Sequence, residues 1–152
     1  MKKKRAAKKR SGPLPLDPLR IRIRNVGLRC TAARLTVLHH LVEAKGPLTH
    51  AEVSDALEGA GFDRTTIYRN LTELTEAGLV SRMELGDHVW RFELRRPPAK
   101  GGPVENHPHF VCTNCGEVSC LDDVNVSITA RDGAGIHRVW EVLLKGTCGD
   151  CG

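Results

Sequence analysis

The chain has 152 residues, which is enough for one domain or two small ones, and it contains six cysteines. It holds no apolar run near the roughly 18 residues of a membrane-spanning helix, and no apolar signal-peptide core follows its basic first residues. We therefore expect a cytoplasmic protein with no membrane partner. Reduced cysteines in that compartment are more often metal ligands or catalytic groups than disulfides.

The net charge of +5 is unevenly distributed along the chain. Residues 1–16 carry seven Lys and Arg and no acid, which gives +7, and Asp17 subtracts one. Residues 18–96 hold twelve basic and ten acidic residues, and residues 97–152 hold four against seven, so these parts contribute +2 and −3. We predict that residues 1–17 form a disordered basic arm, which attracts phosphate backbones without selecting a sequence. A solvated tail with no specific role is the alternative.

Four helices and a hairpin are predicted in residues 18–94. Each helix has a signal for its start: Pro18 in a first turn, and Thr31, Thr49 and Asp63 as N-caps. Thr49 and Glu52 form a capping box, in which each side chain satisfies a free backbone N–H. The helices end near these glycines: Gly27, Gly46, Gly59 and Gly78. Two strands follow, Leu79–Met83 and Val89–Leu94, joined through Gly86-Asp87.

This order of elements predicts a winged helix-turn-helix domain over residues 18–94. Its second helix, about Arg64–Ala77, would lie in the major groove of DNA. Ile67, Leu71 and Leu74 form its buried stripe. The opposite face near its N-terminus has no acid from Arg64 to Thr72, and it offers donors for phosphates and base edges and contacts for thymine methyl groups. Its members are Arg64, Thr65, Tyr68, Arg69 and Thr72. An ordinary solvated helix face is the alternative.

A break rich in Pro and Gly, residues 95–103, predicts a linker or hinge. Residues 104–152 are then predicted to form a small α/β domain, with strand and turn over 110–121, a short helix over 122–130 and a strand over 137–145. Because so small a domain leaves strand edges exposed, we expect it to dimerise by sheet pairing. The predicted fold class is α+β: a winged helix-turn-helix followed by this α/β dimerisation domain.

Two Cys-x-x-Cys pairs, Cys112/Cys115 and Cys148/Cys151, are separated by residues 116–147. Each pair forms a tight knuckle that directs two thiolates at one point, and four thiolates complete a tetrahedral shell. We predict one structural zinc ion per chain. A redox dithiol of the thioredoxin type is the alternative, but it needs a single Cys-x-x-Cys within a βαβ unit.

His107 and His109 precede the first cysteine pair and lie two positions apart, so on an extended strand they point to one face. Imidazole suits zinc, iron, nickel or copper, and we predict that these histidines bind metal. Cys120 is either a further metal ligand or a small buried hydrophobic residue. Cys30, at the start of a helix, is expected to be structural.

In combination, several motifs make the chain resemble the ferric uptake regulator (Fur) superfamily of bacterial metal-responsive repressors, from about Leu19 to Cys151. The motifs are, in order, Gly27-Leu28-Arg29-Cys30-Thr31-Ala32-Ala33-Arg34, Thr65-Thr66-Ile67-Tyr68-Arg69, Ala77-Gly78-Leu79-Val80, Phe92-Glu93-Leu94 and His107-Pro108-His109-Phe110-Val111-Cys112-x-x-Cys115-Gly116. The resemblance implies a homodimer whose winged-helix half binds an inverted-repeat operator in double-stranded DNA, and whose second half dimerises and senses metal. It also implies that Tyr68 and Arg69 contact DNA and that Arg34 lies near the DNA backbone. We add Thr66, of the same motif, to the predicted DNA-binding residues.

The resemblance further implies a regulatory metal site between the two halves. The family builds it from a His at the start of the third helix, a Glu ending the wing, a His-x-His and a later acid. Glu93, His107 and His109 match three of these, whereas Pro47 falls on the first His and Cys120 on the later acid. Because thiolate is a soft ligand, the set of Glu93, His107, His109 and Cys120 suits zinc better than iron. Zinc sensing is our hypothesis, and iron, manganese, nickel and peroxide responses stay open.

The predicted function is metal-dependent repression of metal-homeostasis or related stress genes. Metal held between Glu93 and the two histidines would fix the angle between the halves, so that the two recognition helices of a dimer reach half-sites about one DNA turn apart. One alternative is a constitutive DNA-binding protein in which zinc serves only folding and the sensor site is degenerate. Another is an iron- or peroxide-responsive member of the same family. We find no catalytic motif and expect no enzymatic activity.

Overall fold

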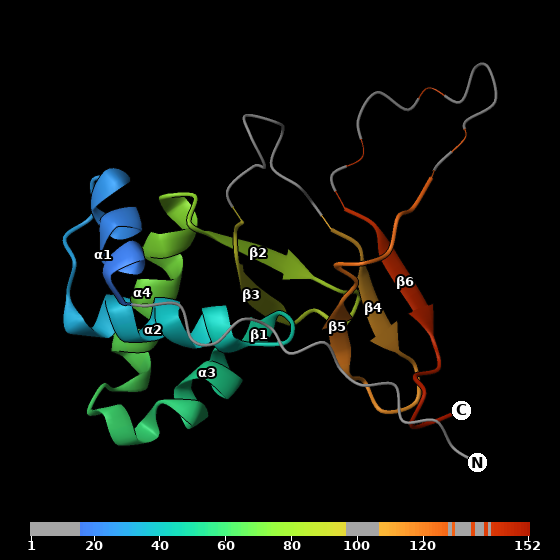
Figure 1. Ribbon diagram of the computed structural model, residues 1–152. Helices are drawn as coiled ribbons and strands as arrows, with labels where there is room; N and C mark the ends of the chain where they lie inside the picture. The colour runs from blue at the N-terminus through green and yellow to red at the C-terminus, as the bar shows by residue number, and fades with distance from the viewer. Residues whose placement is uncertain (1–15, 97–106, 128, 130–134, 136–138, 140) are drawn as a thin grey trace, which may run out of the picture.

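In the computed structural model, residues 16–96, 107–127, 129, 135, 139 and 141–152 are described. Helices and a three-stranded sheet make up the first half of the molecule, and a second three-stranded sheet lies in the other half (Figure 1). This architecture confirms the predicted α+β class. The predicted arm up to residue 15 and residues 97–103 of the predicted linker lie outside the described residues. No helix within the described ranges is long and apolar enough to cross a bilayer.

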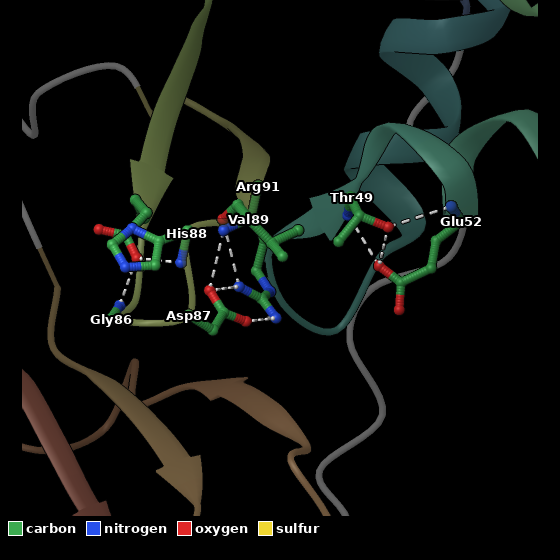
Figure 2. Close-up of polar contacts among 8 residues, drawn as sticks. Thr49, Glu52, Gly86, Asp87, His88, Val89 and Arg91 are labelled. Carbon is green, nitrogen blue, oxygen red and sulfur yellow. Dashed lines mark hydrogen bonds and ion pairs between the residues drawn. The ribbon is translucent and has the colours of Figure 1, made fainter.

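Capping side chains fix where the helices of the first half begin. The helices are α1 (Leu16–Asn25), α2 (Ala32–Glu43), α3 (His50–Ala56), the short 3-10 helix η1 (Glu58–Ala60) and α4 (Arg64–Glu76). Thr31 caps α2 and Asp63 caps α4, each by accepting a hydrogen bond from a backbone N–H of the first turn. Thr49 and Glu52 form the capping box of α3 (Figure 2). The predicted starts of these three helices are confirmed.

α1 begins at Leu16, inside the segment predicted to be the disordered arm. Asp17 lies in its first turn, where a carboxylate is stabilised by the free N–H groups, and Pro18 needs no hydrogen-bond partner there. Leu19 and Ile23 then insert into the core. Leu16 and Asp17, assigned to the predicted arm, therefore belong to this helix, which burial of Leu19 and Ile23 stabilises.

The core of the first half surrounds α4, which packs against α2, α3 and the sheet. The predicted stripe of Ile67, Leu71 and Leu74 is buried, with each residue at most 1% exposed. Full burial of each such side chain contributes roughly 1.5–3 kcal/mol. The rest of the core comes from α1, α2, α3 and the hairpin: Leu19, Ile23, Val37, Leu38, Leu41, Val53, Leu79, Val80 and Phe92. Burial of this stripe leaves the opposite face of α4 to solvent.

The wing is a sheet with the strand order β1-β3-β2, in which both pairs are antiparallel. Its strands are β1 (Leu48–Thr49), β2 (Val80–Glu84) and β3 (Trp90–Leu94). Successive side chains of a strand point to opposite faces. Phe92 is 2% exposed and joins the helical core, so Arg91 and Glu93 point to the other face. The short β1, which the sequence pattern did not predict, is held by pairing of Leu48 with Phe92.

The second sheet has the order β5-β4-β6, with β4 antiparallel to β5 and parallel to β6. The strands are β4 (His109–Cys112), β5 (Val118–Cys120) and β6 (Leu143–Gly146). The helix predicted over 122–130 was wrong for the described residues 122–127 and 129, since a turn at Asp122 and Asp123 is followed by non-helical chain. The β-branched Val124 and Val126 are poor helix formers and are exposed, so packing does not compensate their low propensity. The predicted strand over 137–145 starts later, at Leu143, within the residues described.

The two halves approach each other closely at two glycines. A Cβ atom placed on Gly46, between α2 and β1, would lie 2.7 Å from the backbone oxygen of Val118 in β5. A Cβ atom on Gly86, at the tip of the wing, would lie 3.1 Å from Nζ of Lys145 in β6. Gly46 meets backbone, which cannot move aside cheaply, whereas Gly86 meets the end of a flexible side chain. Of these two positions, Gly46 is therefore the one that tolerates an added side chain less.

We predict that Gly46→Ala destabilises the contact between the halves by about 1–3 kcal/mol, the usual cost of overpacking. The free energy of unfolding should fall, and the radius of gyration in small-angle X-ray scattering should rise. Gly59→Ala is the matched control, because a Cβ atom at Gly59 meets nothing within 4 Å. Equal behaviour of the two variants would contradict the prediction.

Candidate metal centres and nucleic-acid interface

The two Cys-x-x-Cys pairs are brought together by the parallel pairing of β4 with β6. Cys112 ends β4 opposite Gly146, so the chain that leaves β6 passes beside the first knuckle. Two bonds hold it there: the Thr113 N–H donates to the Gly146 carbonyl oxygen at 2.8 Å, and the Cys148 N–H donates to Cys112 Sγ at 3.3 Å. The predicted convergence of the four cysteines, which are distant in sequence, is thus observed.

The four sulfur atoms, those of Cys112, Cys115, Cys148 and Cys151, lie within 4.8 Å of one another. Cys115 Sγ and Cys148 Sγ are 3.8 Å apart, which is the edge, about 3.8 Å, of a tetrahedron with Zn–S bonds of about 2.3 Å. Backbone N–H groups of Cys115 and Cys148 lower the pKa of Cys112 to about 6, which favours a thiolate. Hydrogen bonding with the neighbouring Cys148 raises the pKa of Cys151 to about 12. Only a cation makes four thiolates at this spacing favourable together, so the cluster fits zinc.

A second cluster lies where β3 of the wing faces β4 and β5. Glu93 extends from the outer face of β3, and its Oε1 and Oε2 lie 3.0 Å from His107 Nε2 and 2.9 Å from His109 Nε2. Cys120 Sγ is 2.8 Å from Glu93 Oε1. Cys120 is directly opposite His109 in the β4–β5 register, which explains why both reach the same carboxylate. The four predicted regulatory ligands are therefore in contact across the two halves.

Charge and burial make this second cluster a suitable metal site. The Glu93 side chain is 11% exposed and that of His109 is 5% exposed. Burial raises the pKa of Glu93, but hydrogen bonds from His107, His109 and Cys120 outweigh it, so the pKa stays well below its ordinary value. The same carboxylate raises the pKa of His107. His109 Nδ1 is buried with no hydrogen-bond partner among the described residues, whereas Nε2 of the same ring faces Glu93 in the cluster. Two imidazoles, a carboxylate and a thiol fit a borderline divalent cation.

His50, three residues after Pro47 in the sequence, takes no part in this cluster. His50 points to α4 instead: its Nε2 is 2.9 Å from the Arg64 carbonyl oxygen, and its ring meets Tyr68 edge-on with 5.2 Å between centroids. Pro47, at the position where the family has its first His, is buried beside β5. The cluster thus reaches four donor residues with Cys120 rather than with a histidine from the first half.

Polar contacts lock the tip of the wing in place (Figure 2). Arg91 donates to both carboxylate oxygens of Asp87, at 2.9 and 2.6 Å, and lowers the pKa of Asp87 to about 2. Glu84 accepts hydrogen bonds from the backbone N–H groups of Gly86 and His88 at 2.8 and 2.6 Å. Because Arg91 and Glu93 lie on one face of β3, these contacts steady the strand that carries the Glu93 carboxylate.

An ion pair that the sequence analysis missed joins the two halves beside the second cluster. Arg96 follows β3, and Asp122 follows β5, two residues after Cys120. Their side chains meet in a bidentate pair, with N···O distances of 2.9 and 3.0 Å. The spacing of 26 residues carries no local signal, so only the fold could reveal it. The pair holds the end of β3 close to the end of β5, and this closeness also brings the ligands of the cluster together.

The predicted DNA-contacting residues of α4 lie mainly on its solvent face. Arg64, Thr65, Tyr68 and Arg69 are exposed, and Thr66 is half-buried. Tyr68 is 49% exposed, and its ring packs edge-to-face with that of His50. Arg64 pairs with Asp55 of α3. This face, opposite the buried stripe, can donate to phosphates and base edges.

Arg34, the remaining predicted DNA-binding residue, is placed differently. It is 8% exposed on α2. Its guanidinium donates to the Arg29 carbonyl oxygen and pairs with Glu73 of α4. Arg34 therefore reaches α4 rather than solvent.

Comparisons with known proteins agree with this geometry. The sequence model described as "Ferric uptake regulator family" matches residues 25–139. The chain is 28% identical to the ferric uptake regulation protein of Bordetella parapertussis, over 85% of the chain and 93% of that protein. It is 31% identical to the peroxide operon regulator of Bacillus subtilis, over 85% and 88% respectively. The crystal structure of the Vibrio cholerae ferric uptake regulator is similar, with a TM-score of 0.60 and 25% identity over 86% of this chain and 99% of that one.

The chain has a winged-helix half, a four-cysteine cluster and a mixed-donor cluster between the halves, and a family model matches most of it. The resemblance predicted from the sequence motifs is confirmed. The chain belongs to the ferric uptake regulator family and is a metal-responsive regulator of transcription.

Proposed function

We propose that this regulator responds to zinc and represses transcription as a homodimer on an inverted-repeat operator. One observation carries the proposal: Glu93 of the wing is in contact with His107, His109 and Cys120 of the second half. A cation bound by these four residues stabilises the closed arrangement of the halves and not an open one. Metal concentration would then control the fraction of chains whose recognition helices are set for DNA.

Each residue of the mixed cluster has a separate role in the proposed response. Glu93 connects the wing to the site, and the rigid wing tip transmits its position to the DNA-binding half. His109, the first residue of β4, and His107, two residues before it, supply two nitrogen donors. Cys120 supplies the soft donor, and thiolate favours zinc over iron or manganese. Bound zinc would supply the positive charge that lets these groups approach one another without protons.

The four-cysteine cluster has a different proposed role. Cys112, Cys115, Cys148 and Cys151 leave no open position on a tetrahedral zinc ion, so this ion would serve folding and not sensing. It would hold the end of the chain against β4 and thereby keep the sheet that presents His107, His109 and Cys120. One structural zinc ion and one regulatory ion per chain follow from this division.

An iron response is the second candidate, because two relatives carry names that refer to ferric uptake and to peroxide. The thiol of Cys120 argues against a site built for iron, since iron(II) prefers harder donors. Operator binding measured with zinc, iron(II) and manganese(II) in turn separates these candidates. Equal binding with and without a regulatory metal would instead favour a constitutive DNA-binding protein.

We predict that Cys120→Ser lowers the affinity for a second zinc ion by at least about tenfold, because even outer-shell changes cost 10–100-fold. Isothermal titration of protein already loaded at the four cysteines measures this event directly. Cys30→Ser is the control, since Cys30 packs against the core of the first half. Absence of a second tight zinc event in the wild-type protein would reject zinc sensing.

We predict that His107→Ala combined with His109→Ala abolishes the dependence of DNA binding on metal while the four-cysteine zinc stays bound. Both side chains contact Glu93, so their loss disconnects the wing from β4. The readout is fluorescence anisotropy of a labelled duplex over a zinc titration. A double variant that binds and releases DNA with zinc as the wild type does would contradict the proposed mechanism.

We predict that Cys148→Ser reduces tightly bound zinc and lowers the thermal unfolding midpoint, because a hydroxyl is a poor zinc ligand and the end of the chain loses its anchor to β4. Zinc released per chain, measured with a colorimetric chelator, and a thermal melt test both effects. Cys30→Ser again serves as control and should keep its zinc. Full zinc content in the Cys148 variant would show that the cluster does not hold the structural ion.

A further inference from the structure

The buried position of Arg34 raises a question about how it serves DNA binding. Its guanidinium lies between α2 and α4, where it donates to the Arg29 carbonyl oxygen and to the Glu73 carboxylate. The Arg34 side chain is only 10% exposed, and that of Glu73 is 37% exposed. A phosphate on the outside of the molecule cannot replace these partners without first pulling the side chain out of the protein. Arg34 is therefore poorly placed for direct contact with DNA.

Glu73 lies on α4 where its carboxylate could pair with a DNA-facing arginine, Arg69. It lies four residues after Arg69, and side chains at this spacing are neighbours on a helix surface that pair when their charges are opposite. Arg34, Arg69 and Glu73 line one hollow between α2 and α4, so the carboxylate can reach either arginine. It pairs with Arg34, and no hydrogen bond or ion pair holds the Arg69 guanidinium within the described part of the chain.

We propose that Arg34 is a positioning residue that sequesters Glu73 and so keeps Arg69 free for DNA. Without Arg34, Glu73 pairs with Arg69 along the helix, which neutralises the guanidinium and turns it from the DNA-facing side. The inference rests on the proposed DNA-binding function and adds a role for two residues that do not touch DNA themselves. It also explains why an acid is tolerated one helical turn beyond a residue expected to contact DNA.

The opposing explanation is that Arg34 contacts a phosphate directly, and it predicts a different pattern. Loss of a phosphate contact lowers the slope of log affinity against log salt by about 0.9 per phosphate, whatever residue stands at position 73. If Arg34 acts through Glu73, removal of the Glu73 charge makes Arg34 dispensable for binding. The two explanations therefore differ in the Glu73→Gln background.

The experiment uses full-length protein with saturating zinc and a duplex enriched from a random pool by the wild-type protein. Arg34→Met, Glu73→Gln, Arg69→Gln and the pairwise double variants are compared by fluorescence anisotropy at several salt concentrations. We expect Arg34→Met to weaken binding about tenfold, the usual effect of losing one specific arginine contact. Arg34→Met combined with Glu73→Gln should bind within about threefold of Glu73→Gln alone, with the same salt slope.

A purely structural role for Arg34 is tested in the Arg69→Gln background. If Arg34 acts by freeing Arg69, then Arg34→Met adds no further loss there, whereas a damaged fold lowers affinity in every background. Arg34→Met alone could fail to fold. The comparison of Glu73→Gln with the Arg34→Met/Glu73→Gln double variant then still tests the proposal, because the double variant leaves no unpaired charge between α2 and α4. A lower affinity and a lower salt slope of this double variant would overturn the inference and support direct phosphate contact. If the wild-type protein enriches no duplex with zinc, iron(II) or manganese(II), the proposed function fails as well.

Discussion

The contact of the Glu93 carboxylate with His107, His109 and Cys120 joins the two halves, and the proposed metal response depends on it. Its two oxygens lie 3.0 and 2.9 Å from two imidazole nitrogens, and Oε1 also lies 2.8 Å from a thiol. All three partners belong to the other half of the molecule. The carboxylate is nearly buried, so it needs these partners to remain charged. Because this contact is buried and charged, a bound cation would change its free energy strongly, as the proposed metal response requires.

Two other features support this contact without taking part in metal binding. The Arg96–Asp122 pair joins the halves beside the cluster, and Gly46 lets the backbone of the first half approach β5. The four cysteines lie together where the parallel pairing of β4 and β6 ends, at Cys112 and Gly146. The contact between the halves is thus distributed over an ion pair, a steric fit and the mixed-donor cluster, whereas the four-cysteine cluster lies within the second half.

Local sequence signals predicted most of the first half, because helix starts depend on a few adjacent residues. Thr31, Asp63 and the Thr49–Glu52 box all cap helices as predicted. The prediction was wrong for the described part of 122–130, where exposed Val124 and Val126 have no surface to pack on. It also missed β1, which exists only because Leu48 pairs with a strand more than forty residues away. Both failures concern elements whose stability depends on distant partners.

The sequence by itself determined the chemistry available to this protein: eight candidate ligands in two sets and a helix with an acid-free face, because residue types and short spacings are local properties. The tertiary structure decided how that chemistry is assembled. It put Cys120 opposite His109, turned Glu93 away from the helical core and buried Arg34 against Glu73. Those outcomes depend on strand register and on helix packing, which join residues far apart in the chain. A sequence motif can identify a candidate metal ligand or DNA contact. The residue with which that side chain pairs depends on the packing of the folded chain.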